Sequence, residues 1–117
     1  MKEFMLLFRA DYSRMKFNSQ DEWQAMAKKW QDWISELTAS NHWVASGQQL
    51  GAEGKVIKPG GIITDGPFVE LKESLISYCI IKAESLSEAA ELSTGCPIFT
   101  IGGSVEVRKN VVYNTQN

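Results

Sequence analysis

The stretch from Asp65 to Glu73, which reads DGPFVELKE, holds residue types that can build a polar ligand site. A carboxylate such as that of Asp65, placed at a cleft, can act as a general base or bind a hydroxyl group or a cation if its pKa is tuned. The same residue can instead anchor a turn. Asp accepts hydrogen bonds from backbone N–H groups two residues on, Gly66 tolerates a positive φ and Pro67 fixes φ. Both roles stay open for Asp65.

The residues that follow Asp65 are candidates for the walls and the rim of the same site. Phe68 is expected in the core or as a cleft wall, and Tyr78, from an apolar stretch further along, as a second wall. Glu70 and Lys72 either form a polar rim or belong to a solvated loop, where an exposed ion pair contributes less than about 1 kcal/mol. The candidate ligand-binding residues are Asp65, Phe68, Tyr78, Glu70, Lys72 and Arg9.

The remaining reactive side chains favour structural roles. The single histidine, His42, follows a predicted helix, and a surface cap at the helix end is favoured over catalysis. Cys79 lies inside an apolar stretch and is typical of a small core residue. Cys96 follows a second predicted helix, whose negative dipole end disfavours a thiolate. The two cysteines lack metal-ligand spacing, and no glycine-rich phosphate loop precedes a helix, so we expect neither a metal nor a cofactor.

Composition bounds the class of protein that presents these residues. The chain has 117 residues, of which 44% are hydrophobic and 22% charged, and a formal net charge of −2. These values predict one soluble domain over residues 1–113 with a C-terminal tail over 114–117. An acidic balance argues against a nucleic-acid partner. No stretch has the length of a signal peptide core or of a membrane span, which predicts a cytoplasmic location and no membrane partner.

Two helices are predicted from their start signals. Ser19 and Glu22 have capping-box spacing before a helix over residues 21–39. The apolar stripe expected to face the core consists of Trp23, Met26, Ala27, Trp30, Ile34 and Leu37. Trp33 falls outside this stripe and is left open as a contact to a ligand, to a partner or to solvent. Ser85 and Glu88 repeat the capping-box spacing before a second, shorter helix.

Strands account for most of the remaining chain. They are expected over residues 4–8, 43–50, 55–58, 62–64, 76–82 and 104–109, with a turn at residues 65–67 and a possible extension of the last strand over 111–113. The order predicts an α+β fold of the ferredoxin-like β-α-β-β-α-β type, in which the middle hairpin is elaborated. Such a fold is a sandwich of one antiparallel sheet with both helices on one face.

The bare face of this sheet predicts an assembly. Residues 4–8 are apolar without alternation, and residues 76–82 carry little polarity on either side, as in strands buried on both faces. Monomers rarely keep an apolar patch of that kind exposed. Either a long loop covers the face or two copies pack sheet to sheet about a two-fold axis, and we favour the homodimer.

The motif at Asp65 also carries a family resemblance. The DGPF stretch with the following ELKE resembles the signature of the DGPF-domain proteins, a branch of the YCII-related family. The opening strand, the start of the second helix, Cys96-Pro97 and the closing strand over residues 103–108 fit the same family in the right order. The resemblance spans nearly the whole chain and implies a dimeric α+β barrel, in which ferredoxin-like units pair through their sheets.

The resemblance also implies candidate functions. Better-defined members of the wider family carry a proposed His and Asp pair at a cleft beside the sheet. Asp65 matches the Asp, but the His would lie near Trp30, where this chain has none. The leading expectation is therefore a domain that binds a small, partly apolar molecule in a cleft by the sheet or at the dimer interface. The alternatives are an isomerase- or lyase-like enzyme with Asp65 as the acid–base residue, and a regulatory domain linked to sigma-factor signalling.

Overall fold

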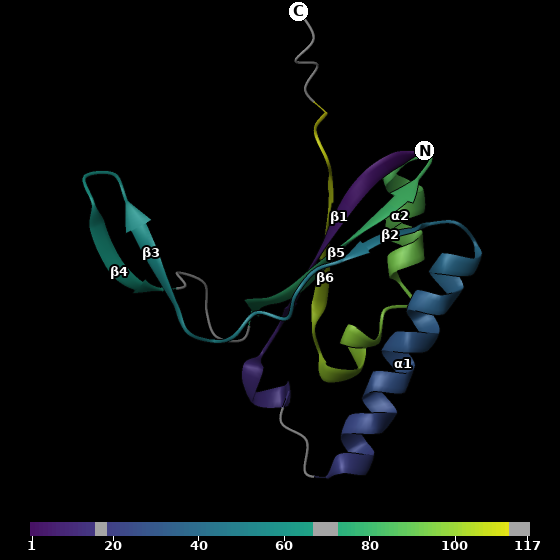
Figure 1. Ribbon diagram of the computed structural model, residues 1–117, viewed down its shortest axis with the longest axis horizontal. Coiled ribbons are helices and arrows are strands. Elements are labelled where there is room, and N and C mark those ends of the chain that lie inside the picture. Colours follow the sequence, from purple (N-terminus) through teal and green to yellow (C-terminus); the bar gives the residue numbers. More distant parts are fainter. Residues whose placement is uncertain (16–18, 67–72, 113–117) are drawn as a thin grey trace, which may run out of the picture.

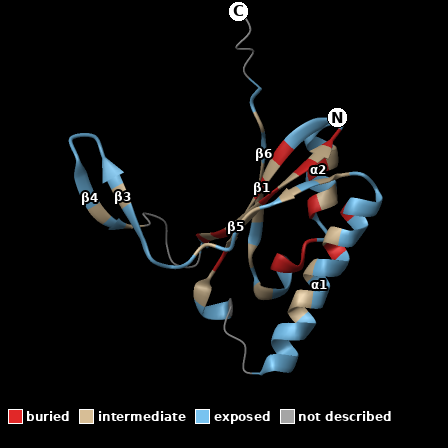
Figure 2. Cartoon of the chain, viewed as in Figure 1, coloured by how far each residue is buried: buried red, intermediate tan, exposed pale blue. Residues whose placement is uncertain are grey.

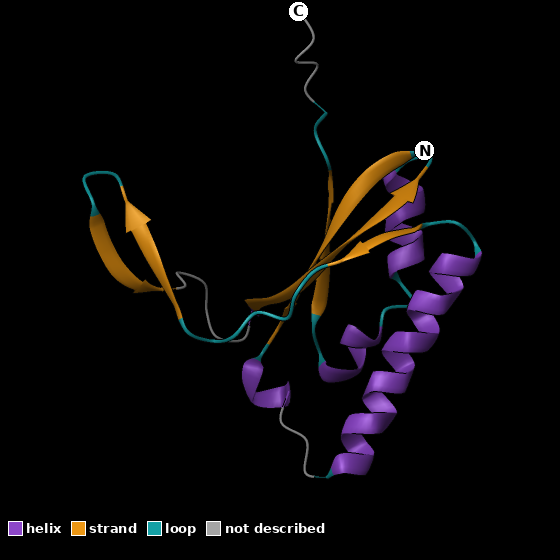
Figure 3. Ribbon diagram, in the orientation of Figure 1, coloured by secondary structure: helices purple, strands orange, loops and turns teal. Residues whose placement is uncertain are grey.

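The computed structural model of the protein describes residues 1–15, 19–66 and 73–112. Figure 1 shows its elements in chain order, and Figure 3 colours them by type. They are β1 (Lys2–Ala10), the 3-10 helix η1 (Tyr12–Met15), α1 (Gln20–Ala39), β2 (Trp43–Ser46), β3 (Gly54–Lys58), β4 (Ile62–Gly66), β5 (Ser74–Ala83), α2 (Leu86–Ser93), the 3-10 helix η3 (Pro97–Ile101) and β6 (Ser104–Lys109).

The main sheet confirms the predicted ferredoxin-like α+β fold. Its four strands lie in the order β2-β5-β1-β6, and all neighbours are antiparallel. The first and third strands of the β-α-β-β-α-β plan are thus central, and the two crossovers bring α1 and α2 to the same face. The indole N–H of Trp33 on α1 donates to the Leu92 carbonyl of α2 at 3.3 Å, which ties the two helices together.

The elaborated middle hairpin forms a sheet of its own. Strands β3 and β4 pair antiparallel with each other, and neither pairs with the main sheet. Figure 1 shows this hairpin projecting from the body of the molecule. We call residues 54–66 the arm. Its turn is formed by Gly60 and Gly61, both of which have the positive φ that glycine adopts without strain.

Both helices begin where the sequence predicts. The Ser19 hydroxyl accepts a hydrogen bond from the Glu22 N–H at 3.2 Å, and the Ser85 hydroxyl accepts one from the Glu88 N–H at 3.1 Å. Each serine has the extended backbone of an N-cap. The Glu88 carboxylate also accepts from the Glu84 N–H at 3.0 Å. Local capping chemistry therefore fixes where both helices enter the fold.

The core lies between the sheet and the helices. Figure 2 shows the buried residues concentrated there, whereas the arm has none. In β1 the burial alternates, with Phe4, Leu6, Phe8 and Ala10 buried against the helices. The side chains between them are half-buried and face the other way. The expectation that β1 is buried on both faces is therefore met on one face only within a single chain.

The core-facing stripe predicted for α1 differs from the observed one at two tryptophans. Trp33 is 5% exposed and belongs to the core, whereas Trp23 is 56% exposed. Trp33 makes edge-to-face contacts with Phe8, Trp30 and Trp43, at ring centroid distances of 6.2, 5.8 and 6.4 Å. Figure 1 shows the reason, since the N-terminal end of α1 reaches beyond the sheet, so that no strand lies beneath the first turns of the helix.

Three predictions about strands and turns also need correction. Strand β2 ends at Ser46 and not at residue 50, although the N–H groups of Gly47 and Leu50 still donate to carbonyls of β5, each at 2.8 Å. Asp65 and Gly66 are the last residues of strand β4 and not part of a turn, while Pro67 lies outside the described residues. Residues 111 and 112 do not extend β6, and Tyr113 lies outside the described residues.

Candidate functional site

The sheet face turned away from the helices is apolar at its centre. We call it the open face. Strand register pairs Met5 with Ile80 and Leu7 with Tyr78, and all four side chains are half-buried. Because side chains alternate along a strand, these residues share the face opposite the buried core. The predicted wall residue Tyr78 therefore lies on the open face.

A glycine beside Tyr78 shapes this face. A Cβ atom at position 47 would come within 2.5 Å of the Tyr78 ring and equally close to the Tyr78 carbonyl oxygen. The ring thus lies over the backbone of Gly47, where any larger residue would displace it. The absence of a side chain at Gly47 therefore leaves the space in which the Tyr78 ring sits on the open face.

Charged side chains gather at one end of the open face. The Arg9 Nε donates to Glu106 Oε1 at 3.4 Å, and the Arg108 guanidinium donates to Glu106 Oε2 at 3.1 Å. The hydrogen bond from Arg108, supported by Arg9, lowers the pKa of Glu106. Two guanidinium groups thus share one carboxylate. The cluster keeps one positive charge in excess, which suits a carboxylate, sulfonate or phosphate group on a ligand.

A cavity of about 410 Å³ adjoins Arg9 at the root of the arm. Arg9 and Leu75, a register pair at the end of the open face, line one side of it. The other side is formed by Tyr12 of η1 and by residues 50–54, which lead from the main sheet into the arm. The cavity is therefore a partly apolar hollow whose lining holds one guanidinium group, that of Arg9, and one carboxylate, that of Glu53, and it is built from the end of β1, the start of β5 and the arm root.

Tyr12 holds the arm root against the sheet. Its hydroxyl donates to the Leu50 carbonyl at 2.6 Å and also lies 3.0 Å from the Gly51 carbonyl and 3.4 Å from that of Leu75. Burial raises the pKa of Tyr12, which keeps the phenol in its donating form. The sequence offered no signal for this residue, because it lies in an irregular, polar segment.

Replacing Tyr12 with Phe should lower the free energy of unfolding by about 1 kcal/mol, because the part-buried carbonyls of Leu50 and Leu75 lose this donor. Urea unfolding measures this loss, and amide hydrogen exchange should show faster opening at Leu50. Tyr78→Phe is the matched control, since no hydrogen bond from the Tyr78 hydroxyl occurs among the described residues. An equal loss in both variants would contradict the assigned role of Tyr12.

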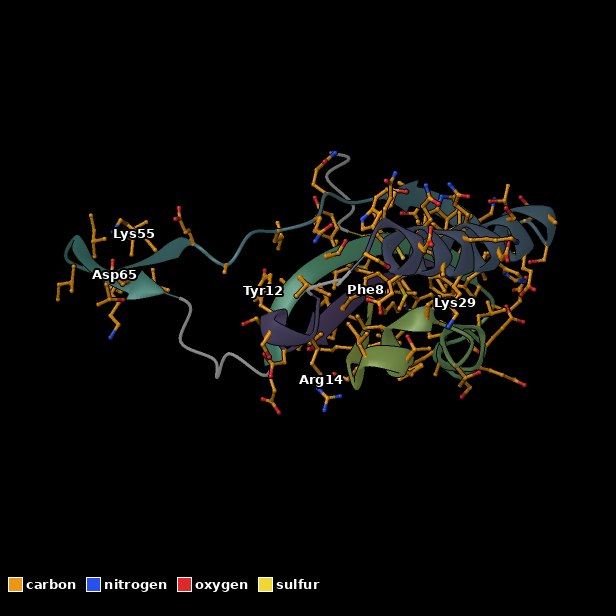
Figure 4. All side chains as sticks on the ribbon, turned by 90° about the horizontal axis from the view of Figure 1, so that it is seen from below. Phe8, Tyr12, Arg14, Lys29, Lys55 and Asp65 are labelled. Carbon is orange, nitrogen blue, oxygen red and sulfur yellow. The ribbon has the colours of Figure 1, made fainter. Side chains whose placement is uncertain are left out.

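The structure does not bring Asp65 to this cavity within one chain. Its side chain is 91% exposed on the arm, where Asp65 Oδ1 lies 2.8 Å from Lys55 Nζ on the neighbouring strand. Figure 4 shows both residues well away from Phe8 and Tyr12. Among the described residues, a hollow of about 550 Å³ beside Asp65 is lined by arm residues and Glu53. Of the other predicted site residues, Phe68, Glu70 and Lys72 lie outside the described residues.

The His42 side chain takes a structural position. Its Nδ1 donates to the Lys82 carbonyl at 2.8 Å and lies 4.0 Å from a carboxylate oxygen of Glu88. Lys82 is seven residues along β5 from Leu75, a separation of roughly 23 Å in an extended strand. His42 therefore links the end of α1 to β5 and α2, at the opposite end of the sheet from the Arg9 cavity.

The position where the resemblance places a histidine belongs to the core. Trp30 packs edge to face on Phe8, with ring centroids 5.2 Å apart. An imidazole there would face the helix side of the sheet and not the open face. The two cysteines are buried as well, and burial raises the pKa of each thiol to about 12, so neither is a nucleophile at neutral pH.

The described part of the chain shows neither a metal-binding group nor a membrane-spanning helix. Over residues 1–15, 19–66 and 73–112, no three His, Cys, Asp or Glu side chains gather in a group that could hold a metal ion. Within the same ranges no helix is both long enough and apolar enough to cross a bilayer.

A family model described as the YCII-related domain matches residues 4–111. This range includes β1 from Phe4 onward, the following elements through β6, the arm and the residues that line the Arg9 cavity. A search of curated proteins found no match to the chain.

Proposed function

The chain belongs to the YCII-related domain family, and we propose that it is a homodimeric domain that binds a small, partly apolar anion in the Arg9 cavity. The observation that carries this proposal is the cavity of about 410 Å³, to which the sheet contributes the Arg9 guanidinium and the segment before the arm contributes Glu53. Apolar ligand surface would lie against Leu75 and the open face. The guanidinium would hold the anionic group through charge-assisted hydrogen bonds.

The dimer in this proposal rests on the open face. Met5, Leu7, Tyr78 and Ile80 form a continuous apolar centre that no helix of the same chain covers. Burial of such a surface contributes about 25 cal/mol per Å². Two-fold packing of two open faces would bury it on both copies. A cytoplasmic location stays a prediction from the sequence.

The two alternative functions stay predictions. An isomerase- or lyase-like reaction with Asp65 as the acid–base residue needs a cleft at Asp65, and within one chain the side chain contacts Lys55 in solvent. A second chain would have to complete such a site. A regulatory domain linked to sigma-factor signalling would require a protein partner, for which the described residues offer no separate argument.

An anionic aromatic probe tests the binding proposal. We expect 1-anilinonaphthalene-8-sulfonate to bind with a fluorescence increase, and Arg9→Gln to weaken that binding by about tenfold, because the sulfonate loses a charge-assisted hydrogen bond. Arg14→Gln is the control. It makes the same charge change on η1, but the Arg14 guanidinium points to the Ile101 carbonyl, 3.4 Å away, and does not line the cavity.

The comparison between the two arginine variants decides the outcome. Far-UV circular dichroism first establishes that both variants are folded, since the probe also binds partly unfolded chains. If the wild type and Arg9→Gln bound the probe with equal affinity, Arg9 would not be part of the binding site. If both variants lost the same amount of probe affinity, the change in net charge alone would explain the loss.

A further inference from the structure

The arm exposes large apolar side chains that no described residue of its own chain covers. Ile57, Ile62 and Ile63 are 69%, 58% and 61% exposed. A two-stranded hairpin alone is marginally stable in water, so an isolated arm needs a surface to pack on. The Cα radius of gyration is 16.3 Å, whereas a compact domain of this length has about 13 Å. The projecting arm thus has the properties of an element that completes its packing outside its own chain.

One face of the arm combines apolar and charged groups in a fixed order. The β3–β4 register pairs Ile57 with Ile63 and Lys55 with Asp65. These pairs lie two residues apart on both strands, so they share one face at a separation of about 7 Å. That face therefore presents two isoleucines and, next to them, one cation and one anion.

The open face of the sheet presents a matching order. Leu7 and Arg9 are two residues apart on β1, again about 7 Å, and their partners across β6 are Glu106 and Ser104. Apolar side chains thus lie next to the ion pair of Arg9 and Glu106. If the arm isoleucines rest on Leu7, Asp65 can reach Arg9 and Lys55 can reach Glu106. Both contacts join opposite charges.

We propose that the arm is exchanged between two copies of this chain, each arm lying on the Arg9 end of the other copy's open face, beside the centre where the two open faces pack on each other. Figure 1 shows the arm directed away from its own sheet, and Tyr12 fixes its root in that direction. Two-fold exchange covers both arms and both open faces with one interface. The inference rests on the dimer proposed above, and it adds that the arm of the partner subunit forms a wall of the Arg9 cavity.

An engineered cross-link tests the exchange. Ile63→Cys, on the arm, and Leu7→Cys, on the open face, are made in separate chains, mixed, allowed to exchange subunits and oxidised. We expect a disulfide-linked dimer on a non-reducing gel, several-fold stronger in the mixture than in either variant alone. The native cysteines are buried and should not contribute. Ser87→Cys, exposed on α2, replaces Leu7→Cys in the control mixture and should give no such band.

The molar mass in solution separates failure of the arm from failure of the dimer. Light scattering of the wild type should give twice the 13.1 kDa of the chain. A monomer would overturn the dimer and the exchange together. A wild-type dimer without the cross-link, tested with Ile80→Cys as well as Leu7→Cys, would overturn the exchange alone. When both cysteines are placed in one chain, a disulfide that forms within a monomer would show that the arm folds onto its own sheet.

Discussion

Trp33→Ala is expected to lower the free energy of unfolding by about 3–5 kcal/mol, because it empties the centre of the aromatic cluster between α1 and the sheet. The ring touches Phe8, Trp30 and Trp43, and its N–H donates to the Leu92 carbonyl. Truncation therefore leaves a cavity and also a carbonyl without this donor. Small domains have a total stability of about 5–15 kcal/mol, so the variant should be close to unfolding.

Trp23→Ala is the matched control for this prediction. It removes the same side chain from the same helix, but at a position where 56% of the residue is exposed. We expect a loss below about 1 kcal/mol, as for most surface substitutions. Urea unfolding followed by far-UV circular dichroism measures both variants. If Trp23→Ala proved the more damaging of the two, the orientation of α1 on the sheet would be wrong.

The tryptophans of α1 show how far helical periodicity reaches. Capping chemistry at Ser19 predicted where the helix starts, because a cap depends on residues within one turn. Periodicity predicted a core-facing stripe that starts at Trp23 and includes Trp30 and Leu37. In the structure Trp30 and Leu37 do pack on the core, but Trp33 joins them there and Trp23 does not. The choice depends on how much of the helix overlies the sheet, which is a tertiary property.

The strands show the same division between local and tertiary information. Alternation predicted strand β6 at residues 104–109, which are its observed ends. The hairpin at the middle of the chain was also expected, but nothing local reveals that β3 and β4 leave the main sheet. Its separation moves Asp65 from the expected cleft to an exposed arm. The motif therefore did not reveal which distant residues lie near Asp65, because that depends on where the fold places the arm.

The Arg9 cavity was only partly predictable. Arg9 was among the candidate residues, and the alternation of β6 places Glu106 and Arg108 on one face of the strand. Their meeting with Arg9 follows from the antiparallel register of β1 and β6, which the sequence does not specify by itself. Tyr12 carried no periodic or motif signal at all, because its role depends on carbonyls that are distant in sequence.

The stability of the fold is expected to fall steeply in alkaline solution, because two buried thiols must ionise when the chain unfolds. Burial raises the pKa of Cys79 and of Cys96 from 9.0 to about 12, and for Cys79 the nearby Cys96 adds to the effect. A pKa that is higher in the folded state contributes stability in full below the unfolded value. That contribution is lost as the pH rises from 9.0 towards 12. Each thiol changes the free energy of unfolding by up to about 1.4 kcal/mol per pH unit in this window.

Alanine variants isolate the thiol contribution. Cys79→Ala and Cys96→Ala should each remove about half of this slope when urea unfolding under reducing conditions is measured at several pH values. Each variant also loses some stability at neutral pH, because it leaves a small cavity, but that loss does not depend on pH. A double variant that kept the full alkaline slope would assign the effect to other groups, such as Tyr12, whose pKa is also raised.

The thiols and the proposed site occupy opposite faces of the same strand. Cys79 faces the helices, where burial keeps it protonated, whereas its neighbour Tyr78 lies on the open face. Chemistry that needs an ionised group at neutral pH therefore has its candidates on the open face and the arm, where Arg9, Glu106 and Asp65 carry charge. A steep alkaline slope that disappears with both thiols would establish that Cys79 and Cys96 are inert at neutral pH.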